Sequence, residues 1–260
     1  MNETVFNNFL SDGKNGFAEL NHGSLCSGGI DGMAEGARRI GIKTIWNCEI
    51  NPFARKLLKQ EYPDAKQYND VNNDTPDERP EIISITSECQ DISIGNPNGL
   101  GVFGHRSKTL FGCLRICGHL KPSFIVIENS GEVTKRGLEF VLCYLAEIGY
   151  DAEWQVLPLT AFKVQQRRTR LYLIARNNQI RLQGSGEETI FSERILQEQF
   201  TGISPGWIDR RSIPEPRTLR ATNGFANYKN RIEVLGNMVH PRAAEYLFTC
   251  IKKAWEEKII

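Results

Sequence analysis

The chain has 260 residues, of which 40% are hydrophobic and 24% charged, a size and composition that suit one globular domain or one domain with a small appendage. It contains no apolar run of about 18 residues, which argues against a membrane-spanning helix. Its first residues lack the basic and apolar regions of a signal peptide. We therefore expect a cytoplasmic protein without a membrane partner.

The cysteines and histidines do not indicate a metal site or a disulfide framework. The seven cysteines are odd in number and contain no C-x-x-C pair, and the four histidines lack the spacing of metal ligands. The net charge is +1, but residues 160–242 contain 14 Lys or Arg against 7 Asp or Glu. That local excess suits a phosphate backbone, although a solvated charged surface explains it equally well.

Strand and helix patterns alternate along the first three quarters of the chain. A short apolar run enters a glycine-rich loop at 22–29, and helices are expected at 32–41, from Pro52 onward, and at 107–121 and 138–149. Strands are expected at 43–50, 81–87, 123–129, 151–157 and 169–177, and a last helix near Pro241. This order predicts an α/β domain with a mostly parallel sheet flanked by helices.

Four polar features fall at the ends of predicted strands, where parallel sheets bind their ligands. They are the loop 27–32, Glu49, Cys89 and the pair Glu128–Asn129. The loop and an acid 20 residues after Gly29 suit a nucleotide-like ligand. The loop is not G-x-G-x-x-G, which disfavours a dinucleotide, and a glycine turn beside a surface glutamate is the alternative.

Two further patterns are open to a catalytic and a structural interpretation. Cys89 follows a strand, as nucleophiles do, but a buried structural cysteine is equally consistent with its surroundings. Glu128 closes an apolar strand, so it should be functional or paired, because an unpaired buried charge is costly. Gln166, Arg168 and Arg170 alternate, and would form either an exposed strand face or donors for a phosphate or carboxylate.

Taken in order, the chain contains LCSGGIDG, CEINPFARKLL, YNDV, CQDIS, RSKTLF, KPSFIVIENS, QRRTR and LGNMVHP. In its motif order and approximate spacing, this series resembles the cytosine-5-specific DNA methyltransferase family, and its short phage and prophage members most closely. The resemblance covers roughly residues 22–175 and 217–250. It implies the Rossmann-like fold of S-adenosylmethionine-dependent methyltransferases, with a small target-recognition insert.

The resemblance also assigns roles to residues of this chain. Cys89 matches the nucleophile and Glu128 the catalytic glutamate, while Gln166, Arg168 and Arg170 match the Q-x-R-x-R motif, with Arg168 expected to hold the glutamate or the base. S-adenosyl-L-methionine, which becomes S-adenosyl-L-homocysteine, would be bound by the following residues: Cys26, Ser27, Gly28, Gly29, Ile30, Asp31, Gly32, Glu49, Ile50, Asp70 and Asn237.

The implied partner is double-stranded DNA, bound by a monomer in the cytoplasm of a bacterial or phage-infected cell, at the nucleoid. A cognate restriction endonuclease, or none, would accompany it. The implied domains are catalytic and cofactor-binding at 1–176, target recognition at 177–216, and a return to the catalytic domain at 217–260. The expected DNA-contacting residues are Gln90, Arg106, Ser107, Arg210, Arg211, Arg217, Arg220, Lys229 and Arg231.

Departures from the family pattern leave two alternatives open. Glu88 replaces a proline before the nucleophile, Ser130 replaces the valine of an E-N-V motif, and Asp31 occupies a glycine position. A carboxylate beside Cys89 would raise the pKa of the thiol. Glu88 favours the alternative of a catalytically silent protein that binds DNA and cofactor. An enzyme that methylates transfer RNA is the other alternative, because one branch of the family acts on transfer RNA.

Overall fold

The computed structural model describes residues 19–87, 108–166, 168–180, 189–201 and 238–258. Seven strands form one sheet in the order β3-β2-β1-β4-β5-β7-β6. The strands are β1 (Asn21–Leu25), β2 (Lys43–Cys48), β3 (Lys66–Tyr68), β4 (Ile82–Ile85), β5 (Phe124–Ser130), β6 (Tyr150–Pro158) and β7 (Thr169–Asn177). The α-helices are α2 (Gly32–Arg39), α3 (Pro52–Glu61), α4 (Lys108–Leu120), α5 (Leu138–Glu147), α6 (Glu193–Phe200) and α8 (Pro241–Lys258). Two 3-10 helices are η3 (Gly131–Lys135) and η4 (Leu159–Phe162).

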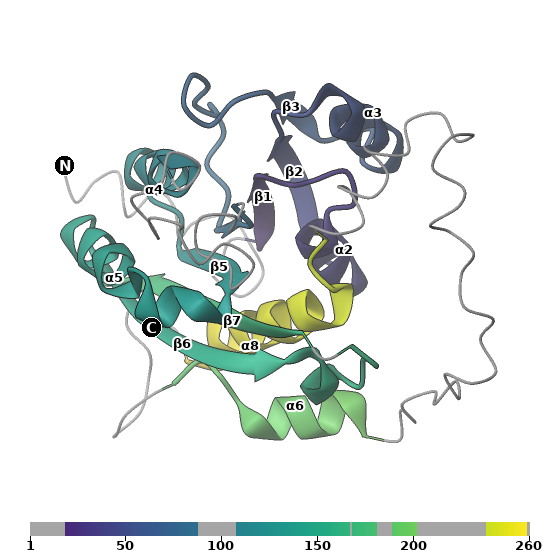
Figure 1. Ribbon diagram of the computed structural model, residues 1–260, viewed down its shortest axis with the longest axis vertical. Helices are drawn as coiled ribbons and strands as arrows, with labels where there is room; N and C mark the ends of the chain where they lie inside the picture. Colours follow the sequence, from purple (N-terminus) through teal and green to yellow (C-terminus); the bar gives the residue numbers. More distant parts are fainter. Residues whose placement is uncertain (1–18, 88–107, 167, 181–188, 202–237, 259–260) are drawn as a thin grey trace.

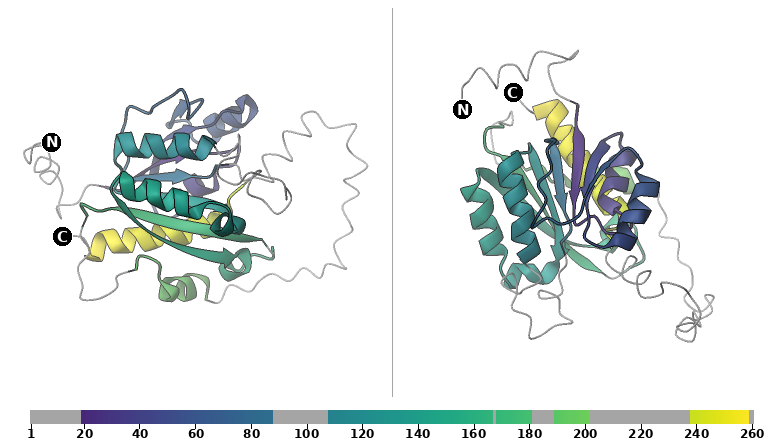
Figure 2. Two further views of the ribbon diagram at one scale, coloured as in Figure 1. Left: turned by 60° about the vertical axis from the view of Figure 1, so that its left-hand side comes forward. Right: turned by 90° about the horizontal axis from the view of Figure 1, so that it is seen from above.

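Helices cover both faces of the sheet, as Figure 1 shows, and the right panel of Figure 2 separates α4 and α5 on one side from α2 and α3 on the other. Alternate residues of the buried strands point to opposite faces. On β5, Phe124 and Val126 therefore join the core beneath α2 and α8, while Ile125 and Ile127 join the core beneath α4 and α5. None of the helices among the described residues is long and apolar enough to cross a membrane.

The parallel register brings the carboxyl ends of β1, β2 and β4 to one level, and β5 extends three residues beyond it. Leu25 at the end of β1 pairs with Cys48 of β2 and with Ile85 of β4, and Ile85 in turn pairs with Ile127 of β5. The residues that follow these strand ends must therefore lie along one edge of the sheet. That edge holds the glycine loop, Glu49 and Glu128, as the sequence predicted.

The first and last helices described pack with almost no space between their backbones. A Cβ atom built on Gly32 would lie 1.9 Å from the carbonyl oxygen of Val239, and one on Gly36 would lie 2.5 Å from the Cβ of Ala244. Figure 1 shows α8, in yellow, beside α2. The absence of side chains at Gly32 and Gly36 thus allows the start of α8 to lie against the helix that follows the glycine loop.

Most predicted elements are confirmed, including the start of α3, where Asn51 accepts hydrogen bonds from the backbone N–H groups of Phe53 and Ala54. The mostly parallel α/β sheet is confirmed as well, with β6 and β7 antiparallel. The sequence analysis missed β3 and α6. Phe200 of α6 belongs to the same core as α8, and the proposed recognition boundaries at 177–216 remain a prediction because residues 202–216 lie outside the described residues.

Candidate active site

The glycine loop after β1 is held by the acid that follows β2. Gly28 has a φ of 67°, and its N–H donates to Oε2 of Glu49 over 2.8 Å. Oε1 of Glu49 accepts from the N–H of Asn51, also over 2.8 Å. A Cβ at Gly28 would meet nothing within 4 Å, so the loop backbone is open to a ligand there.

The strand end that carries Glu49 is fixed by an arginine that the sequence analysis did not identify. Nη1 of Arg55 donates to the carbonyl oxygens of Glu49 and Ile50, at 2.9 and 2.7 Å. Arg55 lies in the first turn of α3, where a long side chain can reach back to the residues before the helix. Its position shortly after the asparagine cap was the available signal.

Ile50 and Asp70 flank this strand end. Ile50 is 67% exposed, unusually open for a large apolar side chain beside a sheet edge. Asp70 follows β3, whose last residue, Tyr68, accepts a hydrogen bond from the N–H of Glu49. The Asp70 carboxylate is half-buried and accepts from the backbone and side chain of Asn72 and from the side chain of Asn73.

These groups fit a cationic nucleoside such as S-adenosylmethionine. An exposed isoleucine offers an apolar surface to a base, and the open backbone at Gly28 allows close approach. The carboxylates of Glu49 and Asp70 give this part of the edge a negative potential that suits a sulfonium cation. Each carboxylate has about four acceptor positions, so those already engaged by the protein still leave acceptors for ligand hydroxyl or amino groups.

Among the other loop residues predicted to bind the cofactor, Ser27 and Gly29 are buried and Cys26 is partly exposed. Ser27 donates to the carbonyl of Ser24 over 3.1 Å. Cys26 has a φ of 58° and its Sγ lies 3.6 Å from Sγ of Cys113 on α4. Ile30 is 40% exposed, so Gly28 and Ile30 are the more accessible part of the loop.

Asp31 caps α2 rather than facing solvent. Its Oδ1 accepts from the N–H of Ala34 over 2.9 Å, and the residue is only 3% exposed. Burial raises the pKa of the Asp31 carboxyl to about 6, although the hydrogen bond from the N–H of Ala34 opposes this shift. The acid at this family glycine position therefore has a structural role in the helix cap.

Asp31→Asn should keep the cap and remove the ionisation, because asparagine is also a preferred N-cap residue. In the wild type, Asp31 begins to ionise in the unfolded chain near pH 3.8 but in the folded chain only near pH 6. Its contribution to stability is therefore full below about pH 4 and lost by about pH 6, a total of about 3 kcal/mol. Over that range the variant should gain stability relative to the wild type.

Urea unfolding across a pH series measures this difference. Asp77→Asn is the opposite control, because Lys66 lowers the pKa of the exposed Asp77 carboxyl to about 2. Removing that charge should lower the free energy of unfolding at neutral pH. The difference from the wild type should disappear at acidic pH, where Asp77 is protonated. A stability difference for Asp31→Asn that does not change with pH would contradict the assignment.

Glu128 lies at the carboxyl end of β5 and forms a buried ion pair. Its Oε1 is 3.0 Å from Nε of Arg170 on the adjacent strand β7, and Glu128 is 7% exposed. Burial raises the pKa of the Glu128 carboxyl, while the positive charges of Arg170 and Arg168 oppose that rise. The sequence predicted that this carboxylate is either functional or paired, and the structure confirms that it is paired.

The other residues around Glu128 have separate partners. Asn129 is buried and accepts from the N–H of Ser130 over 2.7 Å, and Ser130 in turn caps η3 by accepting from the N–H of Glu132. Arg168 donates from Nη1 to the carbonyl oxygen of Met238 over 3.2 Å. Arg170 makes the 3.0 Å contact with Glu128, Arg168 lies close enough to oppose the rise in the pKa of the Glu128 carboxyl, and Gln166 is exposed.

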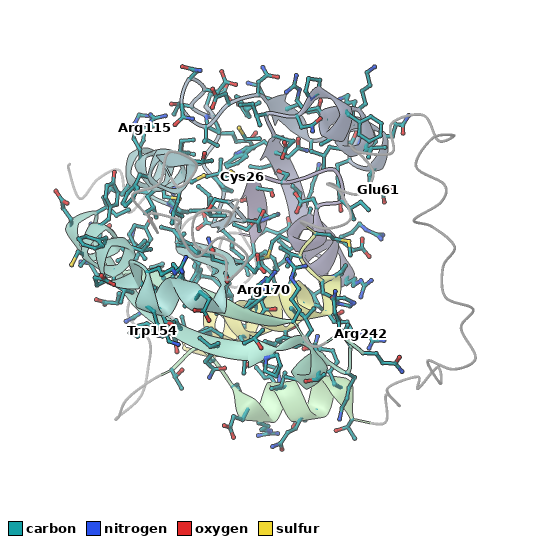
Figure 3. The ribbon with its side chains drawn as sticks, viewed as in Figure 1. Cys26, Glu61, Arg115, Trp154, Arg170 and Arg242 are labelled. Carbon is teal, nitrogen blue, oxygen red and sulfur yellow. The ribbon has the colours of Figure 1, made fainter. Side chains whose placement is uncertain are left out.

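Several predicted site residues lie outside the described residues. They are the predicted nucleophile Cys89, the cofactor residue Asn237, and the DNA-contacting residues Gln90, Arg106, Ser107, Arg210, Arg211, Arg217, Arg220, Lys229 and Arg231. β4, which leads toward Cys89, lies between β1 and β5 in the sheet. Figure 3 labels Cys26, which follows β1, and Arg170 of β7, which pairs with the last residue of β5; both lie in the central part of the view.

Comparison with known proteins gives a consistent result. A family model described as C-5 cytosine-specific DNA methylase matches residues 20–251. Type II methyltransferase M.CviJI of Paramecium bursaria Chlorella virus IL3A is 32% identical over 211 residues, which cover 78% of this chain and 55% of that protein. Type II methyltransferase M.NlaIV of Neisseria lactamica is 32% identical over 164 residues, which cover 56% of this chain and 38% of that protein. The matched part thus spans about half, or less, of these relatives.

Solved structures show the same fold at lower identity. The S. pombe Dnmt2 methyltransferase superposes with a TM-score of 0.54 and 22% identity, covering 71% of this chain and 56% of that one. An E. coli protein described as a putative DNA modification methyltransferase encoded within a prophage superposes with a TM-score of 0.54 and 21% identity. The superposition covers 66% of this chain and 50% of that one.

Proposed function

Because the chain belongs to the C-5 cytosine-specific DNA methylase family, we propose that it transfers a methyl group from S-adenosylmethionine to carbon 5 of a cytosine in DNA. The observation that carries this proposal is the buried Glu128–Arg170 pair at the carboxyl end of β5. A carboxyl group held there can act on a flipped-out base, since the target carbon is inaccessible inside a duplex.

The proposed cofactor residues are those at the ends of β1, β2 and β3. Glu49 and Asp70 would accept hydrogen bonds from the hydroxyl and amino groups of the nucleoside, and Ile50 would pack against its base. Asn237 and the loop from Cys26 to Gly32 complete the proposed set, with the backbone of Gly28 most open to contact. When bound, the cofactor supplies an electrophilic methyl group.

The proposed chemistry begins with the Cys89 thiolate, which forms a bond to carbon 6 of cytosine. The electron pair displaced from the 5,6 double bond makes carbon 5 nucleophilic. Glu128 can protonate ring nitrogen 3 as this charge develops, because burial raises its pKa and so favours the protonated acid. After methylation, a base removes the proton from carbon 5 and the 5,6 double bond re-forms as the carbon–sulfur bond breaks to release the thiolate. Nitrogen 3 returns its proton to Glu128, which regenerates the acid.

Arg170 would hold Glu128 in place during these steps. A guanidinium pairs with a carboxylate in a fixed geometry, and here the two groups come from adjacent strands whose register places Glu128 opposite Tyr172 and Ser130 opposite Arg170. The pair therefore rests on the sheet rather than on a loop. A carboxyl group fixed in this way can be aimed at a base.

The proposed partner is double-stranded DNA, contacted by the arginines and lysine predicted within 202–237. We propose a monomer that works with a cognate restriction endonuclease or with none, in the cytoplasm of a bacterial or phage-infected cell. A recognition region at 177–216 is short, which favours a short target sequence.

A covalent trap tests the activity. Bisulfite sequencing of DNA from cells that express the protein first identifies the methylated sequence. Duplex DNA with 5-fluorocytosine at that position should then form a complex with the wild type that survives denaturation, and Cys89→Ala should form none. A silent binding protein would leave the DNA unmethylated. An enzyme specific for RNA would methylate transfer RNA supplied in a separate reaction, and would not methylate the duplex. Either result would overturn the proposal.

A further inference from the structure

Two arginines join the β6–β7 connection to the start of α8, and they do so from opposite sides. Arg168, just before β7, donates to the carbonyl oxygen of Met238 over 3.2 Å. Arg242, in the first turn of α8, donates to the carbonyl oxygens of Lys163 and Phe162 at the end of η4, over 3.0 and 3.5 Å. We call these reciprocal bonds the arginine clasp. Figure 3 labels Arg242 close to the short helix that follows β6.

The side of the clasp that carries Arg168 is held by backbone hydrogen bonds of the β6–β7 hairpin. The carbonyl oxygen of Arg168 accepts from the N–H of Leu159 over 2.8 Å, which ties it to the start of η4. Immediately beyond it, Thr169 and Arg170 pair with Pro158 and Leu157 in the antiparallel ladder of β6 and β7. The guanidinium of Arg168 is therefore anchored to this hairpin.

The other side of the clasp leads to the glycine loop. Met238 is followed by Val239, which is 5% exposed and whose carbonyl oxygen lies against the Cα of Gly32. Gly32 is the first residue of α2 and directly follows the cap Asp31. A displacement of Met238 would therefore change the position of the backbone on which the start of α2 rests.

We propose that Arg168 is a positioning residue for the cofactor side of the site, acting through Met238, while Arg170 serves the Glu128 side. This inference rests on the proposed function. Arg168 and Arg170 are two residues apart and both lie close enough to Glu128 to oppose the rise in its pKa. Their hydrogen-bonding partners nevertheless differ, since Nε of Arg170 is 3.0 Å from Glu128 and Nη1 of Arg168 binds the carbonyl oxygen of Met238.

A comparison of Arg242→Ala with Arg168→Ala distinguishes two roles for Arg168, which are positioning the segment before α8 and contacting the target base. The bonds of Arg242 join the same two segments as those of Arg168, but from the α8 side. If Arg168 works by holding the two segments together, Arg242→Ala should weaken cofactor binding in the same way as Arg168→Ala, but less. The double variant should then lose less binding free energy than the sum of the losses in the two single variants. If Arg168 contacts the base, Arg242→Ala should leave binding and chemistry as in the wild type.

The test measures the dissociation constant for S-adenosylmethionine by calorimetry without DNA, and the single-turnover methylation rate at saturating cofactor. Loss of a hydrogen bond from a charged group predicts a rise of about tenfold in that constant for Arg168→Ala. The single-turnover rate at saturating cofactor should fall by a smaller factor than the affinity for the cofactor, because the chemical step is measured with the cofactor already bound. Arg168→Lys, which keeps a donor, should fall between the wild type and Arg168→Ala.

Two results would overturn the inference. One is an unchanged dissociation constant in Arg168→Ala; the other is a large loss of single-turnover rate in Arg168→Ala with Arg242→Ala unaffected. If Arg168→Ala does not fold, the same comparison is made with Arg168→Lys and Arg242→Lys.

Amide hydrogen exchange gives a readout that does not depend on activity. Exchange at the start of α2 and in the first turn of α8 should be faster in the Arg168 variants than in the wild type, and equal exchange would contradict the clasp. A wild type that binds no S-adenosylmethionine would refute the proposed function, while hydrogen exchange would still decide whether Arg168 positions the segment.

Discussion

Gly32→Ala is expected to destabilise the protein by about 3 kcal/mol or more, at or beyond the usual range for overpacking. The added methyl group would lie 1.9 Å from the carbonyl oxygen of Val239. That neighbour is backbone, so it cannot turn aside as a flexible side chain could. Either α8 must move away from α2 or the first turn of α2 must distort, and both changes also reach the loop proposed to bind the cofactor.

Gly118→Ala is the matched control, because Gly118 also lies in a helix and a Cβ there would be 3.3 Å from Cγ2 of the Ile148 side chain, not from backbone. That side chain can adjust, and alanine favours a helix over glycine by about 1 kcal/mol. Urea unfolding of both variants, together with calorimetry with S-adenosylmethionine, makes the comparison. Equal stability of Gly32→Ala and wild type would show that the two helices are not packed as described.

Glu128→Gln is expected to slow covalent adduct formation by about 10²- to 10⁴-fold, the usual contribution of a general acid or base. The wild-type rate should rise with pH as Cys89 ionises and then fall as Glu128, whose pKa burial raises, loses its proton. Glutamine has no such proton to lose, so the falling limb should disappear in the variant. The pH profile of the single-turnover rate tests both expectations.

Glu81→Gln is a control for the loss of a buried carboxylate as such. Glu81 is 6% exposed and paired with Arg79 over 3.3 Å, but it precedes β4 at the opposite end of the sheet from Glu128. The two glutamates are buried to nearly the same extent and each pairs with an arginine, so the single-turnover rates of Glu81→Gln and Glu128→Gln can be compared directly. A similar loss of rate in both variants would mean that Glu128 acts through stability and not through chemistry.

The elements best predicted from sequence carry strong local signals. Asn51 and Pro52 indicated the start of α3, and an apolar run ending in Glu128 indicated both β5 and a paired carboxylate. The three-residue strand β3 has too few residues for a pattern. The short helix α6 contributes Ile195 and Phe200 to the core that also contains α8, a contact that local sequence does not reveal.

The different partners of Arg168 and Arg170, the carbonyl oxygen of Met238 and the carboxylate of Glu128, could not be predicted for a different reason. A spacing of two places both residues on one face of an extended segment. The partner that each guanidinium reaches depends on residues from β5 and from the segment before α8. In the same way, the spacing of Gly32 and Gly36 indicates a smooth helix face, but it does not say that residues more than 200 positions later will lie against it.

The contact between α2 and α8 also has a consequence for biosynthesis. Translation makes β1, the glycine loop and α2 first among the described elements, and α8 last. Until α8 leaves the ribosome, Gly32, Gly36 and the apolar face that includes Met33 and Ala37 lack their final partner. The loop proposed to bind the cofactor should therefore reach its final packing late, so that a nascent chain can bind the proposed cofactor only after α8 has been synthesised.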